Sequence, residues 1–200
     1  MQGRSTVGLK EALRLSGVKP ILAGFFCYCS LEATAGLWAS SYLVLQRGIG
    51  AETAAKWAAL FYLGITIGRF LAGFITGKVG AKNMVRGGQA LAGLGIIIIM
   101  LPFGNHWLLL GLVLVGLGCA PIFPSLLHQT PVNFGEDKSQ AIMGMQMAAA
   151  YLGTTFMPLL FGFVGAKVGI GLYPLFLMAF VVVMWGMVEK SNRMKNCTAR

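Results

Sequence analysis

The sequence predicts an all-α membrane protein with six transmembrane helices. Of its 200 residues 56% are hydrophobic and 11% are charged, and the mean hydropathy is +0.74. A soluble domain needs a more polar surface than this composition supplies. Apolar segments of roughly 20 residues, the length that crosses a hydrocarbon layer about 30 Å thick, recur along the whole chain.

The six spans are expected at the apolar runs between polar interruptions. They are Pro20–Val44, Ala54–Ile75, Val85–Leu101, Trp107–Leu127, Ala141–Val164 and Val168–Val188. A basic segment, residues 1–19, precedes this six-helix bundle of residues 20–188, and a short tail, residues 189–200, follows it. The first apolar run is too long for a signal-peptide core and lacks a small-residue cleavage site, so we expect no cleavage.

Lysine and arginine are unevenly divided between the two sides that these spans define. Thirteen lie on the side of both termini, and three lie on the other side. The positive-inside rule makes the side with thirteen cations cytoplasmic. We therefore expect a multi-pass protein of the cell membrane with both termini cytoplasmic, and with loops around Gly48, Gly104 and Gly165 outside.

The first span contains an acidic residue, Glu32. It lies 12 residues into the span, which a rise of 1.5 Å per residue places about 18 Å below the cytoplasmic surface, near the bilayer midplane. A carboxylate at that depth costs about 2.5 to 3.5 kcal/mol unless it faces a cavity or a partner. We interpret Glu32 as binding a polar solute or a proton; the alternative is a hydrogen-bonded structural residue. Tyr28, at i−4, and Trp38 are candidate binding residues on the same helix, although core packing also places aromatic side chains there.

The second span contains glycines at small-xxx-small spacing, namely Gly64, Gly68, Gly73 and Gly77. Such spacing lets helices approach closely, and we expect interhelical contact at these positions rather than gating. Arg69 lies about 10 Å inside Thr76 by helical rise. It either extends to the interface or pairs with a neighbouring helix.

Two later spans carry further candidates. Pro121 and Pro124 remove two backbone donors from the fourth span and should kink or break it. Gln146, in the fifth span, is the deepest neutral polar side chain and a candidate for solute binding.

Several functional classes are disfavoured by the composition. The net charge of +10 comes from cations that punctuate apolar runs, not from a basic patch of the kind that binds nucleic acid. The four cysteines lack CxxC spacing, the only histidines are His106 and His128, and no catalytic motif is present. We expect no metal, no cofactor and no enzymatic activity.

The end of the second span and the basic loop after it carry a recognisable pattern. It comprises Gly64, Gly68, Arg69, Phe70, Gly73, Gly77, Lys78, Gly80 and Lys82. This pattern resembles the cytoplasmic-loop signature of the major facilitator superfamily, which follows the second span of each six-helix half. The acidic residue usual in the first half's copy is replaced by Thr76 or Gly77, as second halves tend to show.

Further residues resemble the C-terminal half of the fucose permease group of sugar:proton symporters. They are Tyr28, Glu32, Gly36 and Tyr42 in the first span, Ala55, Lys56, Tyr62, Gly64, Gly68, Arg69 and Phe70 in the second, and Ile122, Phe123, Pro124 and Ser125 in the fourth.

The resemblance implies one half of a twelve-helix fold, with residues 1–19 matching the linker between halves. It implies alternating access for a small polar solute, such as a sugar, with protons as a candidate coupling ion. Residues expected to bias the conformational states are Arg69, Gly73, Lys78, Lys82, Pro121 and Pro124. The expected partners are the lipid bilayer and either an N-terminal half or a second copy. The alternative is a truncated or non-transporting membrane scaffold that packs with other membrane subunits.

Overall fold

The chain forms a helical bundle in the computed structural model, which describes residues 8–102 and 104–198. These residues form helices and turns but no strands, so the expected all-α class is confirmed. The elements are α1 (Leu9–Ala12), α2 (Val18–Arg47), α3 (Ala51–Val79), α4 (Ala81–Met100), α5 (Asn105–Cys119), α6 (Ile122–Phe134), α7 (Glu136–Lys167), the 3₁₀-helix η1 (Ile170–Leu172) and α8 (Tyr173–Thr198). Six stretches of the described chain are long and apolar enough to cross a membrane, α5 and α6 together making the fourth.

The helices extend beyond the apolar runs that predicted them. α2 begins at Val18, inside the expected linker, and α8 continues to Thr198, through most of the expected tail. A helix satisfies its own backbone groups whether or not its side chains are apolar, so hydropathy marks the lipid boundary rather than the helix end. Residues 1–7 and 199–200, which belong to the expected linker and tail, lie outside the described residues.

The expected loop around Gly165 is wrong. α7 continues through Gly165 to Lys167, and the helix of the sixth span begins at Tyr173 instead of Val168. The turn lies instead at Gly169, whose φ of 129° favours glycine because a Cβ would clash with the backbone there. A polar residue such as Lys167 can remain helical at the membrane surface. The helix ends because the chain turns at Gly169.

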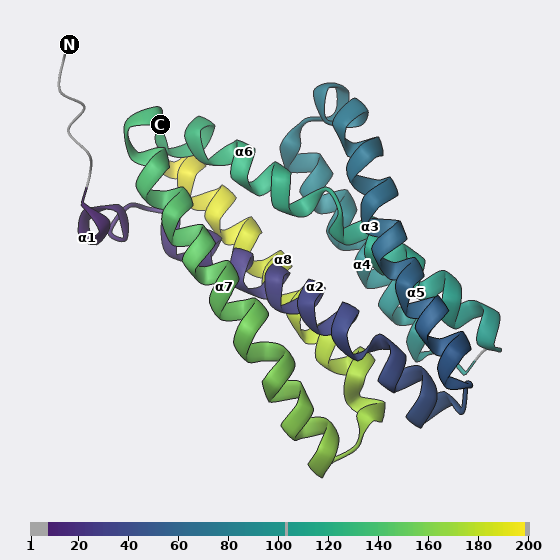
Figure 1. Ribbon diagram of the computed structural model, residues 1–200. Coiled ribbons are helices and arrows are strands. Elements are labelled where there is room, and N and C mark those ends of the chain that lie inside the picture. Colours follow the sequence, from purple (N-terminus) through teal and green to yellow (C-terminus); the bar gives the residue numbers. More distant parts are fainter. Residues whose placement is uncertain (1–7, 103, 199–200) are drawn as a thin grey trace.

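The fourth span is interrupted where its prolines predicted a break. α5 ends at Cys119, Ala120 and Pro121 form a turn, and α6 begins at Ile122 with Pro124 in its first turn. The proline nitrogens cannot donate to the preceding turn, so the helical hydrogen-bond ladder is lost there. After the break α6 runs toward α7 and away from the end of α3 (Figure 1).

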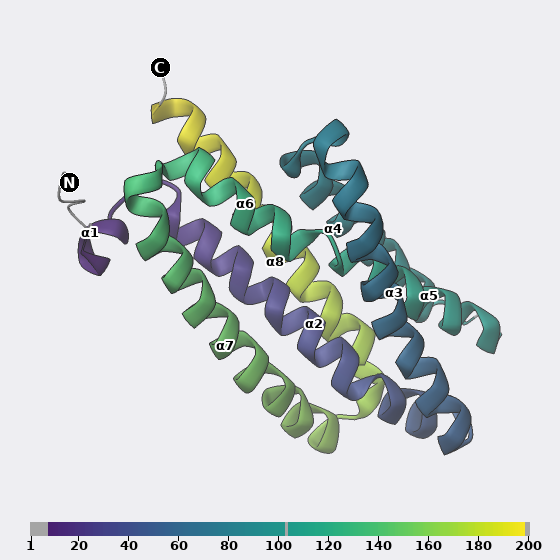
Figure 2. The same ribbon diagram turned by 45° about the horizontal axis from the view of Figure 1, so that its top comes forward.

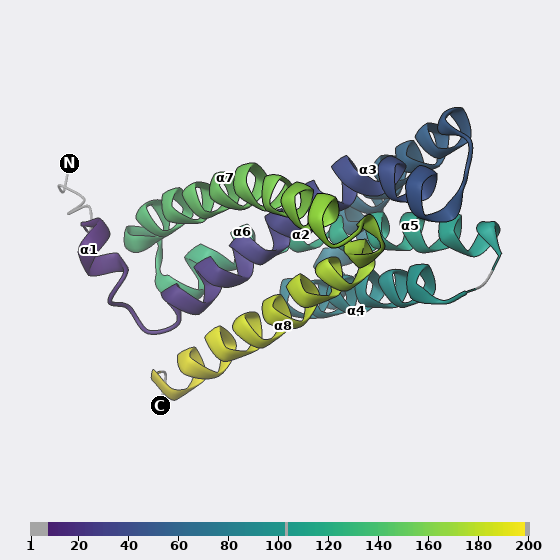
Figure 3. The same cartoon turned by 90° about the horizontal axis from the view of Figure 1, so that it is seen from below.

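The six spans form two groups of three. α2 packs against α7 and α8, and α5 packs against α3 and α4 (Figures 1 and 3). If the first three and last three spans are taken as two repeats, the first helix of each packs against the second and third helices of the other. This is the contact pattern of two intertwined three-helix repeats. α1, the end of α8 and the turn between α6 and α7 gather at one end of the bundle, opposite the turn between α2 and α3 (Figure 2).

The contacts of α5 with α3 and α4 are made through glycines. A Cβ at Gly95 of α4 would stand 2.7 Å from the carbonyl oxygen of Gly111 and 2.8 Å from the nitrogen of Val115. A Cβ at Gly64 of α3 would stand 2.8 Å from the carbonyl oxygen of Val113. No larger residue fits at these positions without moving a backbone, which is how small residues bring membrane helices together.

Only part of the glycine series in α3 contributes to packing. A Cβ at Gly68 would stand 3.1 Å from a carbonyl oxygen of α5, whereas one at Gly73 or Gly77 would meet nothing within 4 Å. The expectation of interhelical contact is therefore confirmed at Gly64 and Gly68 and wrong, within the described chain, at the other two positions. The reason is that α5 ends at Cys119 and α6 diverges, which leaves the last turns of α3 without a partner.

Two polar contacts tie α2 to the helices beside it. The hydroxyl of Tyr173 in α8 donates to the carbonyl of Ala35 at 2.8 Å, and it needs this partner because the side chain is fully buried. The indole N–H of Trp38 donates to the carbonyl of Pro158, which lies inside α7, at 3.0 Å. Both bonds join an aromatic side chain to the backbone of the neighbouring helix and fix the rotation of one helix against the other.

An ion pair joins α4 to α8 near the termini. Nε of Arg86 lies 2.7 Å from Oε1 of Glu189, and Nη2 lies 2.8 Å from Oε2. The parallel pair of bonds matches the fork of the guanidinium to the carboxylate. Glu189, expected to open a separate tail, is therefore part of the bundle.

Replacing Gly95 by alanine should destabilise the bundle. The added methyl group meets the backbone of α5 on two sides, and overpacking of this kind costs about 1 to 3 kcal/mol. The measurement is the thermal unfolding midpoint of the purified chain in detergent. Gly87→Ala, on the same helix with nothing within 4 Å of the added Cβ, is the matched control and should not lower the midpoint. Equal loss in both variants would contradict the contact.

Reversing the charges of the Arg86–Glu189 pair tests its contribution separately. Arg86→Glu and Glu189→Arg should each lower the unfolding midpoint, because each places like charges together. The double reversal should recover most of the loss. If the double variant loses the sum of the two single effects, the pair is not formed in the folded chain.

Candidate functional site

A cavity of about 400 Å³ lies on the face of the bundle formed by α2, α3, α6 and α7. Its lining residues are Tyr28, Cys29, Glu32, Ala33, Tyr62, Arg69, Phe123, Met147, Ala150, Tyr151 and Thr154. They come from both groups of helices, so the cavity lies where the two groups meet.

Glu32 and Arg69 form an ion pair in this cavity. Nη2 of Arg69 lies 3.4 Å from Oε1 of Glu32, and the hydroxyl of Tyr28 donates a hydrogen bond to Oε2. Tyr28 is fully buried, and its ring lies 6.2 Å from the ring of Phe123. Tyr28 is therefore held rigidly under the carboxylate, whereas the longer contact to Arg69 leaves the guanidinium free to exchange partners. The expectation that Tyr28 shares a face with Glu32 is confirmed, and Arg69 pairs with a neighbouring helix instead of only reaching for the interface.

The orientation of Arg69 follows from the glycine contact on the opposite face of α3. Gly64 and Gly68 face α5, while Tyr62 and Arg69 are seven residues apart and therefore share another face of the same helix. A Cβ at Gly36 of α2 would collide with the hydroxyl of Tyr62. Glycine at that position is what allows Tyr62 to reach across to α2.

The ion pair is not covered by the described chain. The side chains of Arg69 and Glu32 are 52% and 25% exposed, and Tyr62 and Tyr151 are also exposed on the same face. A charged side chain in contact with hydrocarbon carries a large penalty. The cavity is therefore built to meet water or another polar surface rather than lipid.

The rest of the wall combines hydroxyl groups with apolar surface. Tyr62, Tyr151 and Thr154 supply hydroxyls, and Phe123 and Met147 supply apolar surface. Together with a carboxylate and a guanidinium, these groups can hydrogen-bond a polar molecule as donors and acceptors while an aromatic face packs against it.

Two of the expected binding residues lie outside the cavity. Trp38 is six residues from Glu32, which turns it to another side of α2, where its ring packs edge-on against Phe161 and its N–H is bonded to α7. Gln146 is fully buried and accepts a hydrogen bond from the hydroxyl of Thr130 at 3.0 Å, which joins α7 to α6. Both side chains hold helices together in this structure and do not touch the cavity.

Two of the residues expected to bias conformation, Lys78 and Lys82, lie at the turn between α3 and α4. Lys78 lies in the last turn of α3, and the single residue Gly80, with a φ of 81°, separates α3 from α4. Lys82 lines a separate polar hollow of about 370 Å³, whose wall includes His128 and Asn133. Lys78 and Lys82 are thus apart from the cavity, whereas Arg69 lines it, as does Phe123 between the two prolines, and a role of these residues in conformation stays a prediction.

Sequence reasoning did not select several residues of the cavity. Tyr151 and Thr154 were missed, and Met147, Ala150, Tyr151 and Thr154 recur at the three- and four-residue spacing of one helix face. That spacing alone did not reveal whether the face meets lipid or a cavity. Cys29 also lines the cavity, and it is a free thiol, as are Cys27 and Cys119. No group of three or more potential metal ligands occurs in the described chain.

Comparison with known proteins identifies the architecture. Residues 21–194 match the model of the family described as Major Facilitator Superfamily. The chain belongs to this superfamily. It is 26% identical over 133 residues to an uncharacterized MFS-type transporter of Yersinia pestis, an alignment that covers 66% of this chain and 33% of that protein.

Solved structures of the superfamily share the fold. The transporter FucP in its outward conformation aligns with a TM-score of 0.79 at 17% identity over 95% of this chain, and the E. coli fucose:proton symporter FucP with 0.77 at 19% over 92%. The peptide transporter POT in complex with alafosfalin aligns with 0.71 at 20% over 88%. The expected resemblance to the superfamily and to the fucose permease is confirmed at the level of fold.

The chain is shorter than the proteins it resembles. It spans 33% of the Yersinia pestis transporter, 46% of FucP in its outward conformation and 39% of POT. The superfamily fold matched here is therefore six helices of a longer architecture.

Cysteine labelling distinguishes a water-facing cavity from a lipid-facing surface. In a chain whose native cysteines are replaced, Tyr151→Cys should react with a membrane-impermeant cationic thiol reagent about tenfold faster than Val182→Cys, because only a hydrated thiol ionises readily. The two positions are similarly exposed, at 72% and 62%, but Val182 lies on α8, away from the cavity. The rates are measured in proteoliposomes, and equal rates would contradict a hydrated face at α7.

Proposed function

We propose that this chain is the C-terminal six-helix half of a secondary transporter that moves a small polar solute by alternating access. The observation that carries the proposal is the Glu32–Arg69 ion pair in an open cavity. A bundle that only packed in lipid would have no use for two charges on an uncovered face. Membership of the superfamily supports the same function.

The chemistry of the wall favours a sugar as the solute. A carboxylate can accept hydrogen bonds from two adjacent hydroxyl groups, and three hydroxyl side chains can donate to and accept from others. Phe123 offers an aromatic surface to the apolar face of a sugar ring. A dipeptide, with its two charges, is the competing solute, since Arg69 and Glu32 could hold its carboxylate and its ammonium group.

The ion pair suits a role as a switch between bound and unbound states. At 3.4 Å the contact between Arg69 and Glu32 is weak, so a solute hydroxyl that donates to Glu32 can replace it. The released guanidinium can then bond to the solute or to the opposite wall. Solute binding would in this way alter the contacts between α2 and α3 and favour one conformation.

The opposite wall is supplied by another six-helix body. Rows of exposed apolar and aromatic side chains on α3 and α7 flank the cavity, including Phe70 and Phe74 of α3 and Phe156 of α7. FucP is about twice the length of this chain, so its fold contains a second six-helix half. This favours an N-terminal half, rather than a second copy of this chain, as the partner. In such pairs the two halves rock about a central site.

We propose that both termini are cytoplasmic, in a cell membrane. Five lysines lie at or near the ends of the spans on one side, and the positive-inside rule makes that side cytoplasmic; they are Lys19, Lys78, Lys82, Lys138 and Lys190. The break at Pro121 and the turn at Gly80 then belong to the cytoplasmic half, where they can change shape as the halves rock.

A non-transporting scaffold is the alternative. Scaffolding accounts for the apolar faces of α3 and α7 but assigns no role to the cavity between them. The two functions differ in one measurable way, because a scaffold tolerates the loss of the Glu32 carboxylate without a change in solute movement.

Replacing Glu32 by glutamine should impair transport. Glutamine keeps the size of the side chain but removes the charge that pairs with Arg69, and loss of a hydrogen bond to a charged group raises the half-saturation concentration about tenfold or more. The measurement is uptake of radiolabelled sugars and dipeptides, at several pH values, by proteoliposomes that contain this chain together with a first half.

The control is Glu52→Gln, which removes an exposed carboxylate that pairs with Lys56 at the other end of α3. This variant should transport like the wild type. Unchanged affinity and unchanged pH dependence in Glu32→Gln would overturn the role of Glu32. Uptake of dipeptides but of no sugar would overturn the choice of solute.

A further inference from the structure

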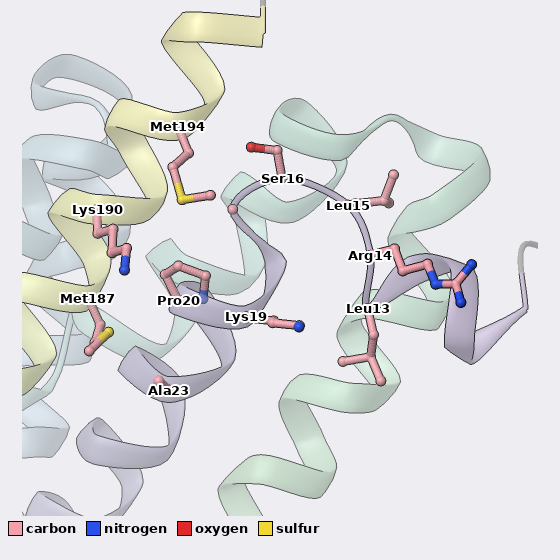
Figure 4. A pocket seen from close by; sticks show the side chains of 11 residues that line it. Leu13, Arg14, Leu15, Ser16, Lys19, Pro20, Ala23, Met187, Lys190 and Met194 are labelled. Carbon is pink, nitrogen blue, oxygen red and sulfur yellow. The ribbon is translucent and has the colours of Figure 1, made fainter.

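A second hollow, larger than the candidate solute site, lies at the end of the bundle, between the α1–α2 connection, the start of α2, and α8 (Figure 4). Its volume is about 700 Å³. Its lining residues are Leu13, Arg14, Leu15, Ser16, Gly17, Lys19, Pro20, Ala23, Met187, Lys190 and Met194. None of them lines the cavity that contains Glu32.

The charge of this hollow is of one sign. Arg14, Lys19 and Lys190 are exposed cations, and no acidic residue is among its described lining residues. None of the three forms an ion pair or hydrogen bond with a described side chain. In Figure 4 the ammonium group of Lys190 points from α8 toward Pro20 of α2, while Lys19 points from the other side of α2 toward Leu13, and Arg14 lies at the outer rim.

The backbone around the hollow holds its shape and adds to its positive potential. Gly17 has a φ of 86°, which bends the chain sharply between α1 and α2, and the hydroxyl of Ser191 donates to the Gly17 carbonyl at 2.8 Å. The bend is thereby fixed against α8. α2 starts at Val18, so the positive end of a 30-residue helix dipole adjoins the three cations.

The apolar part of the hollow continues along the membrane helices. Ala23 lies on α2 and Met187 on α8, each about one turn further into its span than the neighbouring lysine, Lys19 or Lys190. Cations at the mouth and apolar side chains below them match the order of groups in a phospholipid, from phosphate to acyl chain. The site lies at the ends of two spans, where phospholipid headgroups lie.

We propose that this hollow binds an anionic phospholipid. Its headgroup phosphate lies at the mouth of the hollow, in the positive field of Lys190, Lys19 and Arg14, and an acyl chain runs along Ala23 and Met187. A lipid in this place joins the α1–α2 connection to α8. The proposal does not depend on the function of the Glu32 cavity.

The test is native mass spectrometry of the 200-residue chain in a non-ionic detergent, titrated with phosphatidylglycerol or phosphatidylcholine. Phosphatidylglycerol should bind more tightly. The double variant Lys19→Gln/Lys190→Gln should weaken its binding about 10- to 30-fold, the effect of removing two cations beside an anionic headgroup. Ala23→Phe, which fills the apolar part and keeps every charge, should also weaken binding.

The matched control is Lys10→Gln/Lys138→Gln, which removes the same charge from lysines outside the hollow. It should bind phosphatidylglycerol like the wild type, and each variant's unfolding midpoint is checked to show that it remains folded. Equal binding of the two lipids, or equal loss in the control double variant, would overturn the proposal. Displacement of phosphatidylglycerol by inorganic phosphate at equal concentration would overturn the assignment to a lipid.

Discussion

The backbone contact between α3 and α5 at Gly64 and Gly68 fixes how α3 is rotated about its axis. Once these glycines face α5, the helical repeat turns Arg69 toward α2 and Glu32. A bulkier residue at either glycine would push the helices apart and withdraw the guanidinium from the carboxylate. The Glu32–Arg69 ion pair thus depends on the glycine contacts that α3 makes with α5 on its other side.

Much of the fold was predictable because a backbone that crosses lipid must satisfy its own hydrogen bonds, and in a single chain segment only a helix does so. Six apolar runs, the break at Pro121 and the placement of Glu32 beside polar partners all follow from the cost of unpaired polar groups in hydrocarbon. The turn at Gly169 was not predictable from hydropathy, because the helix continues through the polar residue Lys167. Hydropathy indicates where the lipid boundary lies, but it does not predict the residue at which a turn between helices forms.

The sequence predicted the acidic residue of the candidate site and its partner on the same helix, but not the lining residues that come from other helices. Glu32 and Tyr28 could be paired from their spacing on one helix, while Arg69 and Tyr151 required knowledge of which helices are neighbours. Trp38 and Gln146 were chosen because polar and aromatic groups in a span suggest ligands. They bond instead to Pro158 and Thr130, since buried donors and acceptors also need partners between helices.

Pro158 limits what mutagenesis of the cavity can detect. It lies inside α7 and has no N–H, so the carbonyl of Thr154, four residues earlier and beside the cavity, is left without its usual helical donor. That carbonyl could accept a hydrogen bond from a hydroxyl group or from water that reaches it. It belongs to the backbone, so alanine scanning would remove every side chain of this wall and leave that acceptor in place.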